Sequence, residues 1–237
     1  MALLGLVGGM DYISTADYYM RICAEYRKRV GRPWRSPKVL IYSLDFSEVY
    51  RLQELGDWGG LAELIADAAA TLERAGASVL AICSNTAHKV VGAVRSRLGV
   101  PLVSIVEAVG ERVMADGVKR VGLLGTRFTM GESFYRYSLL ELGLEEVLLP
   151  LPEDAAWVSN LIYEDLVRGV VRDEAVSRFK SVLDEMASRG AEGFVLGCGE
   201  LPMLVRNRSE FVGYRLYNSL AIHVSAIVDK VQELEKA

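Results

Sequence analysis

A strand–helix pattern occurs twice along this chain of 237 residues. The first helix-like segment, LAELIADAAATLERAG, ends at Gly76 and is followed by the apolar run SVLAIC. The second, EAVSRFKSVLDEMASRG, ends at Gly190 and is followed by GFVLGC. The apolar segments LLGLVGGM and RVGLLGTR, which precede these stretches in each half, are also alike. Two copies of one pattern predict two similar α/β domains.

Short apolar runs alternate with the helix-like segments along the whole chain. The predicted strands are ALLGLVG, KVLIYSL, SVLAIC, PLVSIV, RVGLLG, EVLLPL and GFVLGC. This alternation predicts an α/β fold of two domains related by a pseudo-two-fold axis, each a mainly parallel sheet flanked by helices. We place the first domain at residues 1–104 plus 213–237 and the second domain at residues 105–212.

Composition and charge exclude several classes of function. The formal net charge is −4 and no basic cluster stands out, so neither nucleic acid nor an anionic membrane is an expected partner. No apolar run approaches the roughly 18 residues of a membrane span, and the start MALLGLVGGMD lacks the basic region of a signal peptide. Three dispersed cysteines (Cys23, Cys83 and Cys198) and two histidines argue against disulfides and a metal site. We expect a cytoplasmic protein with free thiols.

The two helix-ending glycines give a register between the halves. Ser84 lies eight residues after Gly76, and Cys198 lies eight residues after Gly190. The repeat therefore sets Ser84, and not its neighbour Cys83, opposite Cys198. Because side chains alternate along a strand, Cys83 is predicted to point into the packing.

Four segments should meet where the strands end: GGMDYIST, CSNTAH, GTRFTM and GCGELP. Open α/β sheets bind ligands outside the carboxyl ends of their strands, and helix N-termini there attract anionic groups. Cys198 stands between two glycines before an expected helix start, which favours a reactive thiolate over the commoner buried, inert cysteine. Ser84, Asn85 and Thr86 are candidate helix caps or ligand contacts. His88 is either an orienting group or a packing residue, and His223 is predicted to be structural.

Two other enzyme classes fit less well. GLVGGM is not the GxGxxG motif of dinucleotide-binding proteins, and a similar glycine pattern recurs at GLLGTR, where no second dinucleotide is expected. A Cys–His hydrolase with Cys198 as nucleophile lacks an evident partner for its base.

The motifs GGMDYISTADYY, CSNTAHKV, LLGTRFTMGESFYRYSL and GCGELPML together resemble those of the aspartate/glutamate racemase family. The resemblance is strongest to the aspartate-racemase branch that includes broad-specificity amino-acid racemases. It implies two α/β domains with the active site in the cleft between them, a homodimer, an amino-acid substrate and no cofactor. It also implies that two thiols act on opposite faces of the substrate α-carbon, one removing a proton and the other returning one.

The resemblance assigns roles to particular residues. Cys198 falls on the second catalytic cysteine, and Ser84 falls on the first, which the family places immediately before Asn-Thr. The implied substrate-binding residues are Met10, Asp11, Gln53, Asn85, Thr86, Thr126 and Gly199.

Two departures from the family pattern matter. A hydroxyl is a much poorer base than a thiolate, so Ser84 predicts an asymmetric racemase in which Cys198 deprotonates one enantiomer and the reverse reaction is slow. The segments LDFSEVYRL and IYEDLVRG place only Arg51 and Arg168 near the position of the basic residues that bind the side-chain carboxylate in aspartate-specific members. A neutral side chain on the substrate is therefore at least as plausible as an acidic one. Two alternatives stay open: a single-cysteine decarboxylase or isomerase, and a non-catalytic binder of small carboxylates.

Overall fold

The computed structural model describes residues 2–236 and divides into two compact units. Unit 1 comprises Met1–Ile105 and His223–Ala237, and unit 2 comprises Val106–Ile222. The segment that returns to unit 1 begins at His223, whereas the predicted first domain resumes at residue 213. The ten residues between those positions include a short strand that pairs with unit 2, and this pairing moves the boundary.

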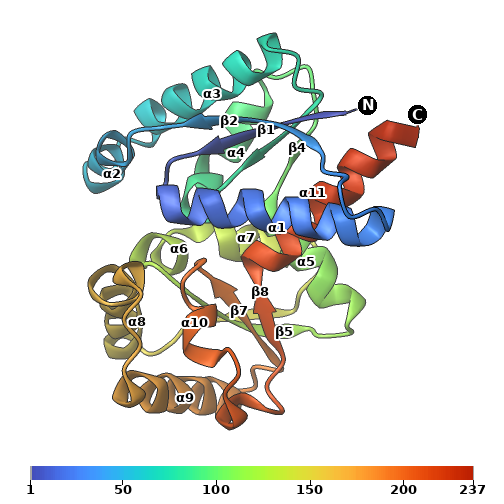
Figure 1. The fold of residues 1–237 in the computed structure, drawn as a ribbon. Coiled ribbons are helices and arrows are strands. Elements are labelled where there is room, and N and C mark those ends of the chain that lie inside the picture. The colour runs from blue at the N-terminus through green and yellow to red at the C-terminus, as the bar shows by residue number, and fades with distance from the viewer. Residues whose placement is uncertain (1, 237) are drawn as a thin grey trace. The chain divides into compact units, whose positions relative to one another are not determined.

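Unit 1 is a four-stranded parallel sheet in the order β2-β1-β3-β4 (Figure 1). In chain order its elements are β1 (Leu3–Gly8), α1 (Tyr12–Val30), β2 (Lys38–Ser43), α2 (Phe46–Glu54), α3 (Trp58–Arg74), β3 (Val79–Ile82), the 3-10 helix η1 (Thr86–Val90), α4 (Val91–Arg95) and β4 (Leu102–Val103). The central strands β1 and β3 are apolar and almost wholly buried, as expected for a parallel sheet covered on both faces.

Unit 2 is a second four-stranded parallel sheet, in the order β6-β5-β7-β8. Its elements are α5 (Ile105–Ala115), which starts at the last residue of the first segment of unit 1, then β5 (Arg120–Gly125), α6 (Arg127–Gly131), α7 (Ser133–Glu141), β6 (Glu146–Leu148), α8 (Pro152–Glu164), η2 (Leu166–Arg168), α9 (Asp173–Ser188), β7 (Gly193–Gly197), α10 (Pro202–Val205), η3 (Ser209–Phe211) and β8 (Leu216–Asn218). Helix α11 (Ser219–Lys236) begins here and continues into unit 1. The seven predicted strands are present, and β8 is an eighth that the sequence analysis missed.

The two sheets repeat each other strand by strand. Strand β3 pairs with β1 from Val79 onward, and β7 pairs with β5 from Gly193 onward, which is the position equivalent to Val79. The amide of Leu80 donates to the Pro101 carbonyl at 2.9 Å, and the amide of Phe194 donates to the Arg215 carbonyl at 2.8 Å. The shift along the chain that relates these pairs also carries Ser84 to Cys198. Two similar α/β units and the internal repeat are therefore confirmed.

The repeat includes the way each long helix ends. Gly76 and Gly190 have φ values of +96° and +103°, which glycine adopts without a Cβ clash. In both units the next amide bonds back to the helix, from Ala77 to the Leu72 carbonyl and from Ala191 to the Met186 carbonyl, each at 3.0 Å. The predicted helix stops are confirmed, and each directs the chain into the central strand that precedes Ser84 or Cys198.

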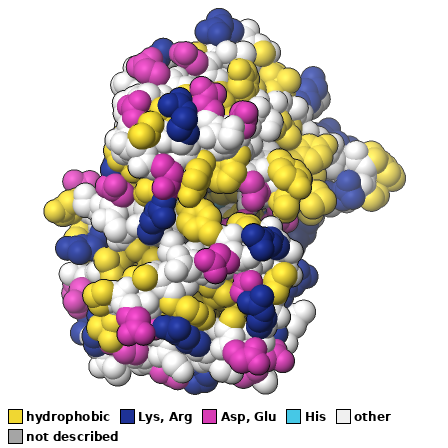
Figure 2. Space-filling model, turned by 90° about the vertical axis from the view of Figure 1, so that its left-hand side faces the viewer, with side chains coloured by type: hydrophobic (Ala, Val, Ile, Leu, Met, Phe, Trp, Pro, Cys, Tyr) yellow, Lys and Arg dark blue, Asp and Glu magenta, His cyan; other side chains and the backbone are white. Residues whose placement is uncertain are grey.

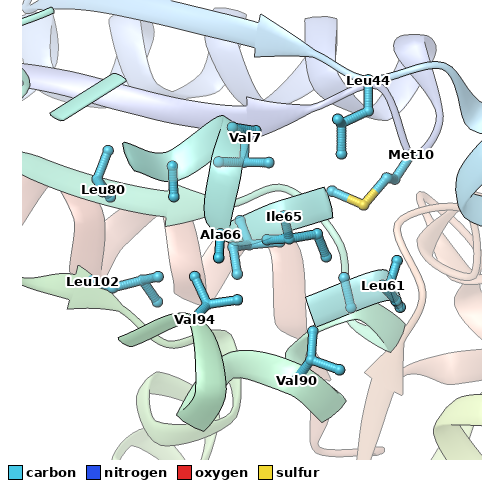
Figure 3. Packing of buried hydrophobic residues seen from close by; sticks show 14 of the residues in the cluster. Val7, Met10, Leu44, Leu61, Ile65, Ala66, Leu80, Val90, Val94 and Leu102 are labelled. Atoms are coloured by element: carbon cyan, nitrogen blue, oxygen red, sulfur yellow. The ribbon is translucent and has the colours of Figure 1, made fainter. Parts of the chain in front are cut away.

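The unit 1 core lies between its sheet and the helices α3 and α4 (Figure 3). Val7, Leu80 and Leu102 from the sheet meet Ile65 and Val94 from these helices. This packing fixes the positions at which the central strands end, and therefore the loops that follow them.

Helix α11 is tied to α1 within unit 1. The Arg29 guanidinium donates to Asp229 at 2.5 Å and to the Ser225 hydroxyl at 2.6 Å, and the Tyr26 hydroxyl donates to Glu235 at 2.7 Å. These contacts hold the returning segment against the first helix of the same unit.

Surface charge is mixed on the face shown in Figure 2, where Lys and Arg side chains alternate with Asp and Glu side chains and form no continuous basic area. Among residues 2–236, no helix combines the length and apolarity needed to cross a bilayer.

Candidate active site

Ser84 is the first half-buried residue after β3. The ladder of β3 ends at Cys83, whose amide donates to the Val7 carbonyl at 2.9 Å. The amide of Ala87 then donates to the Ser84 hydroxyl oxygen at 3.3 Å. Because this bond uses a lone pair of the oxygen, the hydroxyl proton is left to donate elsewhere. Ser84 thus bonds to the first turn of η1, whose N-cap is Asn85, and its hydroxyl keeps its own proton.

Cys83 is packing, as predicted. It is 1 % exposed, and burial raises the pKa of its thiol far above the ordinary value. A thiol that stays protonated in an apolar environment is a poor base and a poor nucleophile. Of the two adjacent residues, only Ser84 reaches the edge of the sheet.

His88 joins the Ser84 loop to the start of α5. Its Nδ1 lies 2.6 Å from the Ser84 carbonyl oxygen, and its Nε2 lies 3.1 Å from the amide nitrogen of Ile105. A carbonyl only accepts and an amide N–H only donates, so Nδ1 carries the proton and Nε2 is the acceptor. The imidazole is therefore neutral and bonded at both ring nitrogens, and it connects the Ser84 loop to α5.

His223 is structural, as predicted. Its Nε2 donates to the Val103 carbonyl at 3.0 Å, and its Nδ1 accepts from the Tyr18 hydroxyl at 3.0 Å. Burial, and to a lesser extent the nearby His88, lowers the pKa of His223 to about 3. The ring meets His88 edge-on with centroids 5.7 Å apart.

The neutral His223 predicts acid sensitivity. Its pKa is about 3 in the folded chain against an ordinary value of 6.5, so the unfolded chain binds more protons between these values. The contribution to stability is complete above about pH 6.5 and is lost at up to about 1.4 kcal/mol per pH unit as the pH falls toward 3. His223→Gln, which keeps a donor for Val103, should flatten this part of the dependence. Urea unfolding between about pH 5 and pH 7 measures it, and equal slopes for the two proteins would contradict the prediction.

Cys198 lies immediately after β7 and is half-buried. Its Sγ donates to Oε2 of Glu200 at 2.8 Å. The carboxylate is two residues away on the same loop and is positioned to accept the thiol proton. Sequence reasoning missed Glu200, although its place two residues after the candidate cysteine in GCGE was a usable signal.

One expectation about Cys198 is wrong. The predicted helix after it is only the four-residue α10, and the segments after Ser84 and Thr126 are also short, namely η1 with five residues and α6 with five. Helix dipoles act through aligned peptides, so such short helices do not provide the field that was invoked for the thiolate and for anion binding. Only the loop before α1 leads into a long helix, of 19 residues. The carboxylate of Glu200, rather than a helix, is the main neighbour of the thiol.

The first loop of unit 1 is built around Thr15. The Gly9 amide donates to the Thr15 hydroxyl oxygen at 2.8 Å, and that hydroxyl donates to the Asp11 carbonyl at 2.7 Å. The Asp11 carboxylate caps α1 by accepting from the Ser14 amide at 2.7 Å. The Met10 side chain points into the core near Leu44 (Figure 3). Asp11 is thus held by hydrogen bonds at both its carboxylate and its carbonyl, and the Met10 side chain belongs to the core.

Unit 2 contains a related threonine arrangement. Thr126 caps α6, with its hydroxyl accepting from the Thr129 amide at 3.3 Å, and Thr129 is fully buried. The Thr129 side chain packs against Gly125, so that a Cβ added at Gly125 would lie 2.9 Å from it. Thr15 packs against Gly8 in the same way. Gly125 pairs with Gly197, so the Thr126 loop and the Cys198 loop lie side by side at the carboxyl edge of the sheet.

Three of the remaining predicted residues lie in the loops at these edges. Asn85 and Thr86 are buried in the Ser84 loop, and Gly199 is half-buried beside Cys198. Gln53 lies instead on α2, where it is buried with 6 % exposure. Unit 1 therefore groups Asp11 with Ser84, Asn85 and Thr86 at the ends of β1 and β3, and unit 2 groups Thr126 with Cys198.

The equivalent residues at the two edges differ in their hydrogen bonds. Ser84 accepts from the Ala87 amide, whereas the Cys198 thiol donates to the Glu200 carboxylate. Within residues 2–236, no group of three or more His, Cys, Asp or Glu side chains is placed to hold a metal ion.

Solved structures resemble the chain over nearly its full length. An aspartate racemase homologue from Pyrococcus horikoshii OT3 is 33 % identical with a TM-score of 0.84, covering 98 % of this chain and 100 % of the other. A Yersinia pestis protein provisionally described as an Asp/Glu racemase is 36 % identical with a TM-score of 0.91, again covering 98 % and 100 %. The glutamate racemase of Francisella tularensis, solved with D-glutamate, is 14 % identical with a TM-score of 0.71 over 99 % of this chain and 82 % of that one, a likeness of fold alone.

Curated relatives match a shorter stretch. The glutamate racemase of Shewanella sp. strain MR-7 is 30 % identical over 143 residues, which is 60 % of this chain and 51 % of the relative. The match thus spans about half the length of that relative. The family description Asp/Glu/Hydantoin racemase, in contrast, matches residues 7–227. The chain belongs to the Asp/Glu/hydantoin racemase family.

Proposed function

We propose that the protein is a cofactor-independent amino-acid racemase with Cys198 as the base and Ser84 as the opposing proton donor. The observation that carries the proposal is the asymmetry at two positions that the repeat makes equivalent. Cys198 has a carboxylate acceptor 2.8 Å away, and Ser84 has an amide donor 3.3 Å away. One group is arranged to lose a proton and the other to give one.

The proposed reaction conserves protons at each step. The Cys198 thiol passes its proton to Glu200, and the resulting thiolate takes the α-proton from one face of the substrate. The Ser84 hydroxyl gives its proton to the opposite face of the planar carbanion, and solvent restores that proton and removes the one on Glu200. Inversion requires this acid and base on opposite faces, so the proposal needs both loops to approach the same α-carbon.

The rates of α-proton exchange should follow the same asymmetry. By resemblance to the family, the second catalytic position serves the L-enantiomer, so α-proton exchange without inversion should be faster from the L-enantiomer. A hydroxyl is a weak base, and loss of one general base typically lowers a rate by about 10²–10⁴-fold. Inversion itself must have the same kcat/KM in both directions, because the enantiomers have equal free energies. The asymmetry should therefore appear as slow α-proton exchange from the D-enantiomer, which needs Ser84 to remove the proton.

Substrate recognition is proposed at the carboxyl edges of the two sheets. Met10, Asp11, Asn85, Thr86, Thr126 and Gly199 would hold the α-carboxylate and the amino group. The buried amide of Gln53 would contact the substrate side chain, which favours a neutral or broadly varied amino acid over a strictly anionic one. The working form is proposed to be a cytoplasmic homodimer.

Proton NMR in D₂O tests the proposal with a panel of D- and L-amino acids. We expect α-proton loss from at least one L-amino acid, together with the D-product, and much slower exchange from the D-enantiomer. Equal exchange from both enantiomers would contradict the asymmetry. Binding without exchange would favour a non-catalytic carboxylate binder, and release of CO₂ from a substituted malonate would favour the single-cysteine decarboxylase.

A further inference from the structure

The proposed reaction uses Ser84 but leaves the buried imidazole behind it without a role. His88 is 1 % exposed and bonds at Nδ1 to the Ser84 carbonyl and at Nε2 to the Ile105 amide. Protonation at Nε2 would place an N–H against the Ile105 N–H, so the ring cannot shuttle protons in this arrangement. Its function must come from the two groups that it connects.

The Ile105 amide is the first amide of α5, one of the groups that have no partner within a helix. His88 provides its acceptor, and in doing so anchors the Ser84 loop to a fixed helix end. Two residues earlier, the Val103 carbonyl is held by His223, whose ring meets that of His88 edge-on. The anchor is therefore itself held by a second buried side chain of unit 1.

The equivalent loop of unit 2, which carries Cys198, is oriented in a different way. The repeat places Pro202, the first residue of α10, at the position equivalent to His88. A proline has no side-chain donor for the Cys198 carbonyl, and the Cys198 side chain is instead oriented by Glu200. In unit 1 the position equivalent to Glu200 is Thr86, which has no carboxylate to accept from Ser84. The Ser84 loop is bonded instead through its backbone, where His88 donates to the Ser84 carbonyl.

We propose that His88 is a positioning residue that fixes the Ser84 loop for delivery of the proton in the inversion step. The inference rests on the proposed function, because it assigns His88 to one half of that reaction. Loss of the anchor should impair proton delivery by Ser84 and leave proton removal by Cys198 largely intact. L-substrate should then exchange its α-proton with solvent on the Cys198 face while inverting less often.

Two variants test the two hydrogen bonds of the His88 imidazole separately. In His88→Asn the amide nitrogen takes the place of Nδ1 and can still donate to the Ser84 carbonyl, but the side chain is too short to reach Ile105. In His88→Gln the amide oxygen can reach the position of Nε2 and accept from Ile105, but the donor to Ser84 is lost. His223→Gln is a companion variant: it keeps a donor for the Val103 carbonyl but removes the ring that meets His88 edge-on.

The measured quantity is the ratio of D-product formation to α-deuteration of L-substrate in D₂O. We expect His88→Gln to lower this ratio about tenfold or more. Losing one acid–base group altogether typically costs about 10²–10⁴-fold in rate, and misplacing it should cost no more than that. His88→Asn should stay within about threefold of the parent, and His223→Gln, which leaves both His88 hydrogen bonds possible, should lower the ratio less than His88→Gln does. Equal falls in both rates, or equal ratios for the Asn and Gln variants, would overturn the assignment.

A readout without substrate keeps the test independent of the proposed function. The backbone amide resonances of residues 84–87 should shift in His88→Gln and stay close to the parent in His88→Asn. If the parent protein exchanges no amino acid, the proposed function fails while the NMR spectra still decide whether His88 holds the loop. Unchanged loop resonances in His88→Gln would remove the positioning role.

Discussion

Replacing Cys198 by Ala is expected to lower α-proton exchange from the L-amino acid by about 10²–10⁴-fold, the usual effect of losing a general base. Production of the D-enantiomer should fall by the same factor, because Ser84 can deliver a proton only after Cys198 has removed one. D₂O exchange followed by proton NMR measures both rates in one sample.

Two further variants show whether this effect belongs to the reactive thiol. Cys83→Ala should leave the exchange rate close to that of the parent, since that thiol is buried and the pKa of its sulfur is raised by burial. Glu200→Gln should give an intermediate loss of about 10-fold or more, because the amide cannot take the thiol proton that the carboxylate accepts at 2.8 Å. Full exchange in Cys198→Ala, or a large loss in Cys83→Ala, would contradict the assignment of the base.

Much of the fold could be predicted because its signals are local and repeated. Apolar runs flanked by amphipathic helices indicate parallel strands, and Gly76 and Gly190 mark the helix ends through their positive φ values. Their equal distances to Ser84 and Cys198 identify equivalent residues, and the backbone pairing of β3 and β7 confirms that equivalence.

The features that were missed depend on contacts between distant residues or on very short elements. Strand β8 is only three residues long, and its pairing with β7 is not visible in its own sequence. The role of His88 arises from a bond to Ile105, 17 residues away, so its position in CSNTAHKV could not distinguish orienting from packing. The helix after Cys198 ends after four residues, which no local periodicity indicated.

Replacing Ser84 by Cys is expected to accelerate α-proton exchange from the D-amino acid by about 10- to 100-fold, with inversion rising by one common factor in both directions. The new thiol would provide the missing base on the Ser84 face, and a general base contributes about 10²–10⁴-fold. We expect the lower part of that range because the loop has Thr86 where unit 2 has Glu200, so the thiol has no carboxylate two residues along its own loop to take its proton. Exchange of the D-amino acid in D₂O measures the gain directly.

Ser84→Ala is the matched control for this gain. It should abolish formation of D-product while L-substrate still exchanges on the Cys198 face, so the two variants at one position should change opposite half-reactions. A Ser84→Cys protein that folds with the stability of the parent and exchanges D-substrate no faster would show that the hydroxyl is not what makes the reaction asymmetric.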